Sequence, residues 1–147
     1  MNVNTQYIET YAEAETVAFA KDFAKDLSAG DIVLLQGDLG MGKSVFSRAV
    51  IKYLCDDDQM DVPSPTFTLV QTYDAAIGDI WHFDLYRLND PSEVYETGWE
   101  EAISGGIVLV EWPERLGALK PAQAIDVIFS GDASPDKRII KVVKNGV

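Results

Sequence analysis

Residues 37–44 read Gly-Asp-Leu-Gly-Met-Gly-Lys-Ser and match the complete phosphate-binding loop pattern G-x-x-x-x-G-K-[ST]. The apolar run Ile32–Leu35 precedes this loop, and a stretch with helical patterning, Lys43–Leu54, follows it. That context matters because the loop binds phosphate only where it joins the end of a strand to the start of a helix. The sequence therefore constrains the fold around a strand–loop–helix unit and predicts binding of a nucleoside triphosphate.

The chemistry of the loop explains its residue types. Glycines let backbone N–H groups approach the phosphates, and the positive end of the following helix adds to the attraction. Lys43 is expected to reach the β- and γ-phosphates, and the Ser44 hydroxyl is expected to hold Mg2+. The predicted nucleotide contacts in this segment are Gly37, Asp38, Leu39, Gly40, Met41, Gly42, Lys43, Ser44 and Val45. The alternative, a glycine-rich turn with a surface lysine, would leave the complete pattern to chance.

Composition limits the classes of function. The chain of 147 residues suits one domain, 1–147, and it carries 24 acidic against 12 basic residues, a formal net charge of −12. A protein that holds nucleic acid by itself usually shows a basic face, so we expect no strong direct nucleic-acid binding. The acidic cluster of Asp56–Asp58 and Asp61 is interpreted as a solvated loop.

The sequence predicts a cytoplasmic protein without a membrane segment. No run approaches the ~20 apolar residues of a membrane-spanning helix, and the segment Met1–Thr5 lacks the charged and apolar regions of a signal peptide. The single cysteine, Cys55, excludes an internal disulfide framework and suits a reducing compartment.

Hydrophobic patterning predicts an α/β protein, a P-loop NTPase-like three-layer sandwich with a mixed, mainly parallel central sheet and added antiparallel hairpins. The expected strand 32–36, whose first four residues are apolar, and the fully apolar run 107–110 are expected to be central and parallel, because their side chains must be covered on both faces. The other expected strands are 6–9, 66–73, 80–85, 124–130 and 138–144, and the expected helices are 11–28, 43–54 and one beginning near Pro91. Thr10 and Glu13 have the spacing of a capping box, and Gly98 is expected to break or bend the helix near Pro91.

Two carboxylates have placements that suit a nucleotidase. Glu111 directly follows the apolar run 107–110, and ligands of α/β sheets bind beyond the carboxyl ends of strands, so Glu111 is expected near Ser44 as a metal ligand. Asp84 lies within a predicted strand, where Asp is disfavoured, and is expected to orient the attacking water or to bind Mg2+ through water. The alternatives are an exposed strand-end acid and a surface-facing strand position. His82, on the same strand face as Asp84, is interpreted as a structural hydrogen-bonding group.

A polar segment between these elements is a candidate switch. The hydroxyls of the segment Ser64–Thr68, among them those of Thr66 and Thr68, are placed to approach the γ-phosphate, although the start of a capped strand accounts equally well for them. Trp112, next to Glu111, is interpreted either as packing or as a cover for the nucleotide pocket. The guanine-reading Asn/Thr-Lys-x-Asp segment is missing, which favours ATP over GTP.

Four segments, taken in order, resemble one known family: Gly37–Ser44, Ser64–Val70, His82–Leu88 and Val110–Glu114. Their combination is similar to the bacterial TsaE (YjeE) family, the small ATPases of tRNA threonylcarbamoyladenosine synthesis. Met41 and Ser44 replace the commoner Ala and Thr of the family loop, and Ser44 keeps the metal-binding hydroxyl. Residues after Glu114 match only in outline.

The resemblance implies an ATPase that converts ATP to ADP and phosphate with Mg2+, weakly when alone. It implies catalytic roles for Lys43, Asp84 and Glu111, with Ser44 and Glu111 as metal ligands. Thr10 matches a family position near the nucleotide, and Arg138 is assigned the same role. The family also implies TsaD and TsaB as protein partners, an assembly that ATP hydrolysis would reset between turnovers.

Two other functions are compatible with the loop. A small-molecule kinase usually brings several arginines over the phosphates from a lid, whereas this chain has few arginines and no evident lid insertion. A nucleotide sensor that does not hydrolyse ATP would share the same loop.

Overall fold

The computed structural model describes residues 3–145, and its seven strands form one sheet with the order β1-β7-β6-β2-β5-β4-β3. The strands are β1 (Val3–Thr10), β2 (Ile32–Gln36), β3 (Val70–Ala75), β4 (Gly78–Asp84), β5 (Ile107–Glu111), β6 (Ile125–Gly131) and β7 (Arg138–Asn145). The helices are α1 (Glu13–Ala24), α2 (Lys43–Leu54) and α3 (Trp99–Ile103). There are also two short 3-10 helices, η1 (Pro91–Thr97) before α3 and η2 (Pro113–Leu119) after β5.

The middle of the sheet is parallel and its two sides are antiparallel. β2 runs parallel to both β5 and β6, and β4 runs parallel to β5. The hairpins β3–β4 and β6–β7 are antiparallel, and β1 adds to the edge of β7 in the antiparallel sense. This arrangement confirms the predicted mixed sheet, including the central parallel pair of apolar strands.

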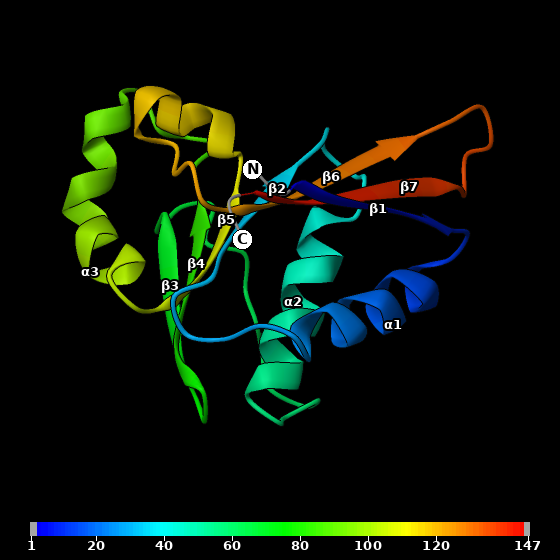
Figure 1. Cartoon of the computed structure of the whole chain (residues 1–147), viewed down its shortest axis with the longest axis horizontal. Coiled ribbons are helices and arrows are strands. Elements are labelled where there is room, and N and C mark those ends of the chain that lie inside the picture. The colour runs from blue at the N-terminus through cyan, green and yellow to red at the C-terminus, as the bar shows by residue number, and fades with distance from the viewer. Residues whose placement is uncertain (1–2, 146–147) are drawn as a thin grey trace.

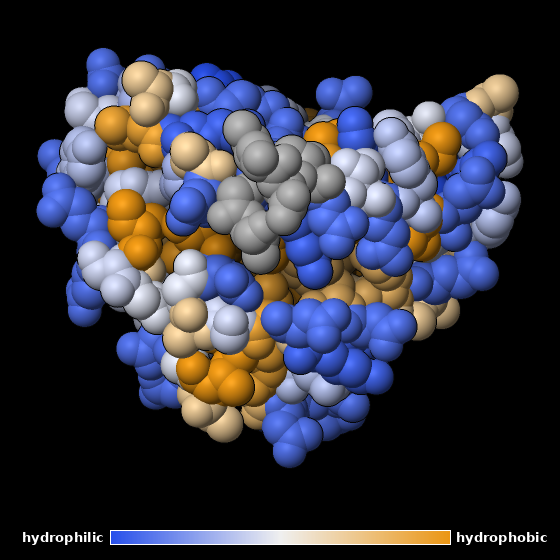
Figure 2. Space-filling view, viewed as in Figure 1, coloured by the Kyte–Doolittle hydropathy of each residue, from blue (hydrophilic) through white to orange (hydrophobic). Residues whose placement is uncertain are grey.

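Helices cover both faces of the sheet and make a three-layer sandwich (Figure 1). α1 and α2 lie against one face, and α3 lies on the other side of the sheet with η1 and η2. Successive residues of a strand point to opposite faces, so Leu35 and Leu109 join the core under α1 and α2, whereas Leu34 and Val108 join the other core. Hydrophilic residues cover much of the outer side of α1 (Figure 2). No helix in the described residues has the length and apolar character that crossing a membrane requires.

The segment predicted as the start of a strand at residue 66 is a turn. The Leu69 N–H donates to the Pro65 carbonyl at 2.7 Å, and Leu69 has a left-handed φ of 68°. The ladder with β4 therefore begins only at Val70, which lies opposite Phe83. The β-branched and aromatic composition of 66–69 suggested a strand, but the turn at Pro65 prevents pairing there.

The predictions around α1 are wrong in two details. The helix spans Glu13–Ala24 rather than 11–28, and its N-cap is Ala12, without a side-chain cap. Thr10 does not form the expected capping box, because it ends β1 opposite Arg138 and its hydroxyl hydrogen-bonds the Thr16 hydroxyl at 3.0 Å. The predicted bend at Gly98 is confirmed, since its φ of 90° separates η1 from α3.

Truncation of a central strand residue should show how strongly this parallel core supports the fold. Leu109 is fully buried in β5, and Leu109→Ala is expected to lower the free energy of unfolding by about 2–5 kcal/mol. Ile77→Ala, at a turn position that is 43% exposed, is the control and should change it by less than about 0.5 kcal/mol. Urea unfolding of both variants measures the difference, and equal losses would contradict the assignment of Leu109 to the core.

Candidate nucleotide site

The loop between β2 and α2 has a backbone shape that its glycines make possible. Gly37, Gly40 and Gly42 have φ values of 139°, 80° and 109°, in the region that side chains disfavour. A Cβ atom at Gly37 would lie 2.5 Å from the carbonyl oxygen of Phe129, so this position also requires glycine for close packing against β6. Beyond Gly42, the first N–H groups of α2 have no intrahelical acceptor and are oriented to bind an anion.

Lys43 is buried at the start of α2. Its ammonium donates to the carbonyl oxygen of Gly37 and lies 3.5 Å from the centre of the Trp112 ring. Burial lowers the pKa of Lys43, and the neighbouring carboxylates, Glu111 foremost, oppose that shift. The Lys43 side chain therefore lies between the loop backbone and an aromatic face, and both are favourable neighbours for an ammonium group.

Ser44, Glu111 and His82 form a hydrogen-bonded chain beside the loop. The Ser44 hydroxyl donates to Glu111 Oε1 at 3.2 Å, and His82 Nε2 lies 2.7 Å from Glu111 Oε2. Glu111 and His82 are only 3% and 2% exposed, so the carboxylate depends on these partners for its solvation. The parallel pairing of β2 with β5 places Glu111 opposite Leu35, at the strand end from which the loop departs. The structural role predicted for His82 is therefore support of Glu111.

Asp84 ends the neighbouring strand β4 and pairs with Glu111 across the ladder. Its Oδ1 accepts from the backbone N–H of Tyr86 at 3.0 Å, and its Oδ2 accepts from the Thr66 hydroxyl at 3.1 Å. Ser64 Oγ lies 2.8 Å from the Thr66 hydroxyl oxygen. Asp84 is 5% exposed, so these two donors fix the direction of its carboxylate.

These side chains meet at one cavity of about 350 Å³. The cavity is lined by Leu39, Gly40, Gly42, Lys43, Ser44, Val45, Ser64, Thr66, Asp84, Glu111 and Trp112. The three residues predicted to be catalytic, Lys43, Asp84 and Glu111, therefore face the same space. An arrangement of one cation, two carboxylates and a loop rich in N–H groups can hold a polyphosphate and a divalent cation together.

The donor set fits Mg2+ better than a metal held wholly by protein. Within residues 3–145, no group of three or more His, Cys, Asp or Glu side chains is arranged to bind a metal ion. The Ser44 hydroxyl and the Glu111 carboxylate offer two oxygen ligands 3.2 Å apart. Mg2+ in nucleotide sites typically takes one or two protein oxygens and completes its shell with phosphate and water.

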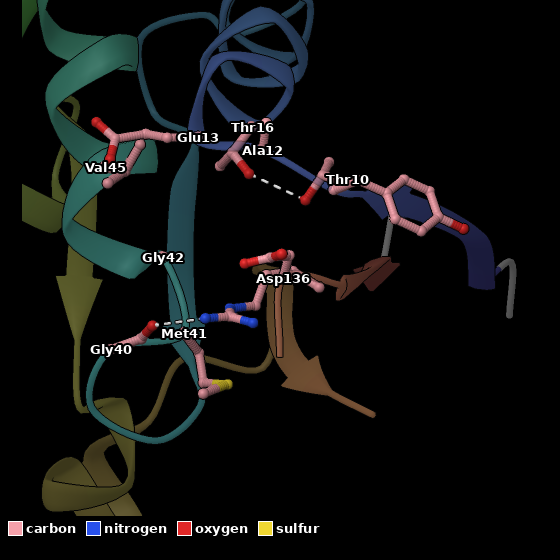
Figure 3. Close-up of a pocket in the computed structure, with 11 residues that line it drawn as sticks. Thr10, Ala12, Glu13, Thr16, Gly40, Met41, Gly42, Val45 and Asp136 are labelled. Carbon is pink, nitrogen blue, oxygen red and sulfur yellow. Dashed lines mark hydrogen bonds between the residues drawn. The ribbon is translucent and has the colours of Figure 1, made fainter. Parts of the chain in front are cut away.

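A second cavity of about 200 Å³ lies on the other side of the loop (Figure 3). It is lined by Thr10, Tyr11, Ala12, Glu13, Thr16, Gly40, Met41, Gly42, Val45, Asp136 and Arg138. The Arg138 guanidinium donates to the Gly40 carbonyl at 3.4 Å, which ties β7 to the loop. Gly40, Gly42 and Val45 line both cavities, so the loop is a wall between them.

Comparison with known proteins gives the family. Residues 10–140 match the family model described as threonylcarbamoyl adenosine biosynthesis protein TsaE. This chain belongs to the TsaE family. Its relatives include TsaE of Rickettsia conorii, which is 44% identical over 91% of this chain and 75% of its own length. TsaE of Haemophilus influenzae is 36% identical over 95% of this chain and 88% of its own length.

A solved structure agrees with the fold as well. The crystal structure of Bacillus subtilus YdiB superposes with a TM-score of 0.76 at 26% identity, covering 99% of this chain and 89% of that one. The sheet, the loop and the flanking helices described above are therefore the architecture of this TsaE-family chain.

The structure separates the predicted site residues of this TsaE-family chain into two groups. Most of them line one of the two cavities, including Thr10, Arg138, Thr66 and Trp112. Thr68 does not, because it is exposed and accepts a hydrogen bond from the side chain of Gln71 at 3.1 Å. The loop residues Gly37 and Asp38 line neither cavity.

Several lining residues were absent from the predicted set. Thr16 carries a hydroxyl at the second cavity, and it had a detectable signal as a polar residue on the apolar face of α1. Glu13 and Asp136 also line the second cavity. Asp136 had no local signal, because it reaches this place only through the pairing of β7 with β1.

The hydrogen bond between His82 and Glu111 should contribute measurably to stability. His82→Phe removes the imidazole donor and leaves a buried carboxylate with one partner fewer, so the free energy of unfolding is expected to fall by about 1.5–3 kcal/mol. Urea unfolding of His82→Phe, Glu111→Gln and the double variant measures the coupling, which should exceed about 0.5 kcal/mol. Additive losses would show that the two side chains do not interact in solution.

Proposed function

We propose that this TsaE-family protein binds ATP with Mg2+ and hydrolyses it to ADP and phosphate in the service of tRNA threonylcarbamoyladenosine biosynthesis. The observation that carries the proposal is the convergence of Lys43, Ser44, Asp84 and Glu111 on one cavity beside the phosphate-binding loop. The family description and the names of the relatives supply the pathway.

The two cavities divide the binding of ATP between them. The nucleoside lies in the cavity of Thr10 and Arg138, and the phosphates pass over the loop towards Ser44. Lys43 leaves the carbonyl of Gly37 and the ring of Trp112 to donate to the β- and γ-phosphate oxygens, which are stronger acceptors. Backbone N–H groups of the loop and of the first turn of α2 also donate hydrogen bonds to the phosphates.

Hydrolysis depends on the two carboxylates at the strand ends. Glu111, whose Oε2 lies 2.7 Å from His82 Nε2, directs its Oε1 towards Ser44, and these two residues would hold the metal. When bound, Mg2+ supplies charge neutralisation for the phosphate oxygens. Asp84, fixed by Thr66 and by the Tyr86 N–H, orients the attacking water towards the terminal phosphate.

The protein acts as a cytoplasmic subunit with the TsaB and TsaD proteins, and hydrolysis resets that assembly between turnovers. The relatives are named for biosynthesis of the modified nucleoside, which supports a place in the same pathway. The formal net charge of −12 favours contact with proteins over direct contact with RNA. Turnover by the isolated subunit is expected to be slow, and an ATPase assay with and without a reconstituted TsaB–TsaD pair tests the proposed function.

Replacement of the loop lysine should weaken the binding of the ATP phosphates. Lys43→Ala removes at least one charge-assisted hydrogen bond, worth about 1.5–3 kcal/mol, so the dissociation constant of ATP should rise by tenfold or more. Lys52→Ala, on the same helix but outside both nucleotide cavities, is the matched control. Calorimetry at fixed Mg2+ measures both affinities, and an unchanged affinity in Lys43→Ala would refute phosphate binding at this loop.

The two carboxylates should divide metal binding from hydrolysis. Asp84→Asn should retain ATP affinity and slow phosphate release by roughly 10²–10⁴-fold, because the oriented base is lost. Glu111→Ala should lose the Mg2+ dependence of ATP binding, because one of two protein ligands is gone. Single-turnover phosphate release and Mg2+ titrations separate the two effects. Unchanged turnover in Asp84→Asn, or wild-type Mg2+ dependence in Glu111→Ala, would remove that residue from its assigned role.

A further inference from the structure

Exposed aromatic and arginine side chains lie next to residues that line the cavity of Asp84, since Phe67 follows Thr66 in the chain and Tyr86 packs on Trp112. Phe67 is 80% exposed and Tyr86 is 43% exposed. The Arg87 guanidinium lies 4.3 Å from the centre of the Phe67 ring, and the Arg115 guanidinium lies 5.8 Å from the centre of the Tyr86 ring. We call these four residues, Phe67, Tyr86, Arg87 and Arg115, the aromatic–arginine surface.

Local contacts hold the rings of this surface in place, although the rings are not buried in the core of the protein. Phe67 is the most exposed large hydrophobic residue of the described chain, and it sits on the tight turn closed by the Leu69 N–H and the Pro65 carbonyl. Tyr86 packs on Trp112 with ring centres 4.9 Å apart. Stacked guanidinium and aromatic groups lose little freedom on binding, and Tyr, Phe and Arg are the residue types that anchor protein interfaces.

Charge decides the kind of partner. The exposed Arg87 and Arg115 each lie over one ring of this surface, and the two pairs are linked because Tyr86 and Arg87 are consecutive residues. The surface therefore carries two cations in a chain with a formal net charge of −12. Nucleic acid would need a continuous set of cations along its backbone, whereas the exposed Glu114 lies next to Arg115 in the chain. A protein face offers the complementary chemistry, with carboxylates for the guanidiniums and an apolar recess for the Phe67 ring.

We propose that the aromatic–arginine surface docks a protein partner that presents carboxylates around an apolar recess. The inference deepens the proposed function and rests on it for the choice of the TsaB–TsaD pair as the probe. It assigns the contact to particular residues, which the family description and the relatives' names do not do.

Two residues of the aromatic–arginine surface are, or directly follow, the residues that donate hydrogen bonds to Asp84. Phe67 follows Thr66, whose hydroxyl donates to Asp84 Oδ2, and Tyr86 donates its own N–H to Asp84 Oδ1. A partner that holds the Phe67 and Tyr86 rings therefore also holds both donors of the carboxylate. Docking at this surface fixes Asp84 and leaves the nucleoside cavity beyond the loop untouched.

The test compares partner affinity with nucleotide affinity. The dissociation constant for a purified TsaB–TsaD pair is measured by calorimetry with ATP and Mg2+ and again without nucleotide. Phe67→Ala and Arg87→Glu should each raise it by about tenfold or more in the condition where the wild type binds, as loss of an interface anchor does. Affinity of the free variants for a fluorescent ATP analogue should stay within about twofold of wild type, because neither side chain lines a nucleotide cavity.

A second aromatic–cation pair of the chain supplies the control. Tyr7 is 66% exposed, and Lys141 Nζ lies 5.7 Å from the centre of its ring, on the strands β1 and β7. Tyr7→Ala and Lys141→Glu make the same chemical changes there and should leave affinity for the pair unchanged. Thermal unfolding of all four variants, followed by circular dichroism, confirms that each is folded.

Three results would overturn the proposal. These are failure of the wild-type protein to bind the TsaB–TsaD pair, equal affinity of Phe67→Ala, Arg87→Glu and wild type for the pair, and loss of affinity in these variants for tRNA alone but not for the pair. Absence of ATP binding by the wild type would refute the nucleotide site instead. If the wild type does not bind ATP, the affinities measured without nucleotide still show whether Phe67 and Arg87 contact the pair.

Discussion

The parallel pairing of β2 with β5 is the constraint on which the site depends. Their register places Glu111 opposite Leu35, so the end of one strand carries a carboxylate to the point where the other strand turns into the loop. The contact between Ser44 and Glu111 joins positions 67 residues apart, and only a rigid pair of buried strands holds such a contact in place. β4, the next strand of the sheet, brings a second carboxylate to the same edge, because Asp84 lies opposite Glu111.

Features that depend on local chemistry could be predicted from the sequence. The loop requires glycine at Gly37 for both backbone angle and close packing, and that requirement is visible in the motif. The apolar runs of β2 and β5 predicted central parallel strands because no polar position interrupts them. The sequence alone predicted that Glu111 lies near Ser44, because Glu111 ends one central strand and Ser44 belongs to the loop that follows the other.

Features that depend on distant pairing could not be predicted. Thr10 has the spacing of a helix cap, but pairing with Arg138 at the far end of the chain commits it to β1. Asp136 reaches the second cavity for the same reason, with no pattern of its own. The turn before β3 was missed because residue composition does not reveal the hydrogen bond between Pro65 and Leu69, nor the left-handed backbone of Leu69.

The loop with Gly40, Gly42 and Val45 is a partition shared by two chambers. A ligand confined to the chamber of Thr10 would contact one side of this partition only. A ligand with a long anionic tail that reached the other chamber would contact both sides. Because Gly40, Gly42 and Val45 line both chambers, any displacement of this segment changes the shape of both chambers at once.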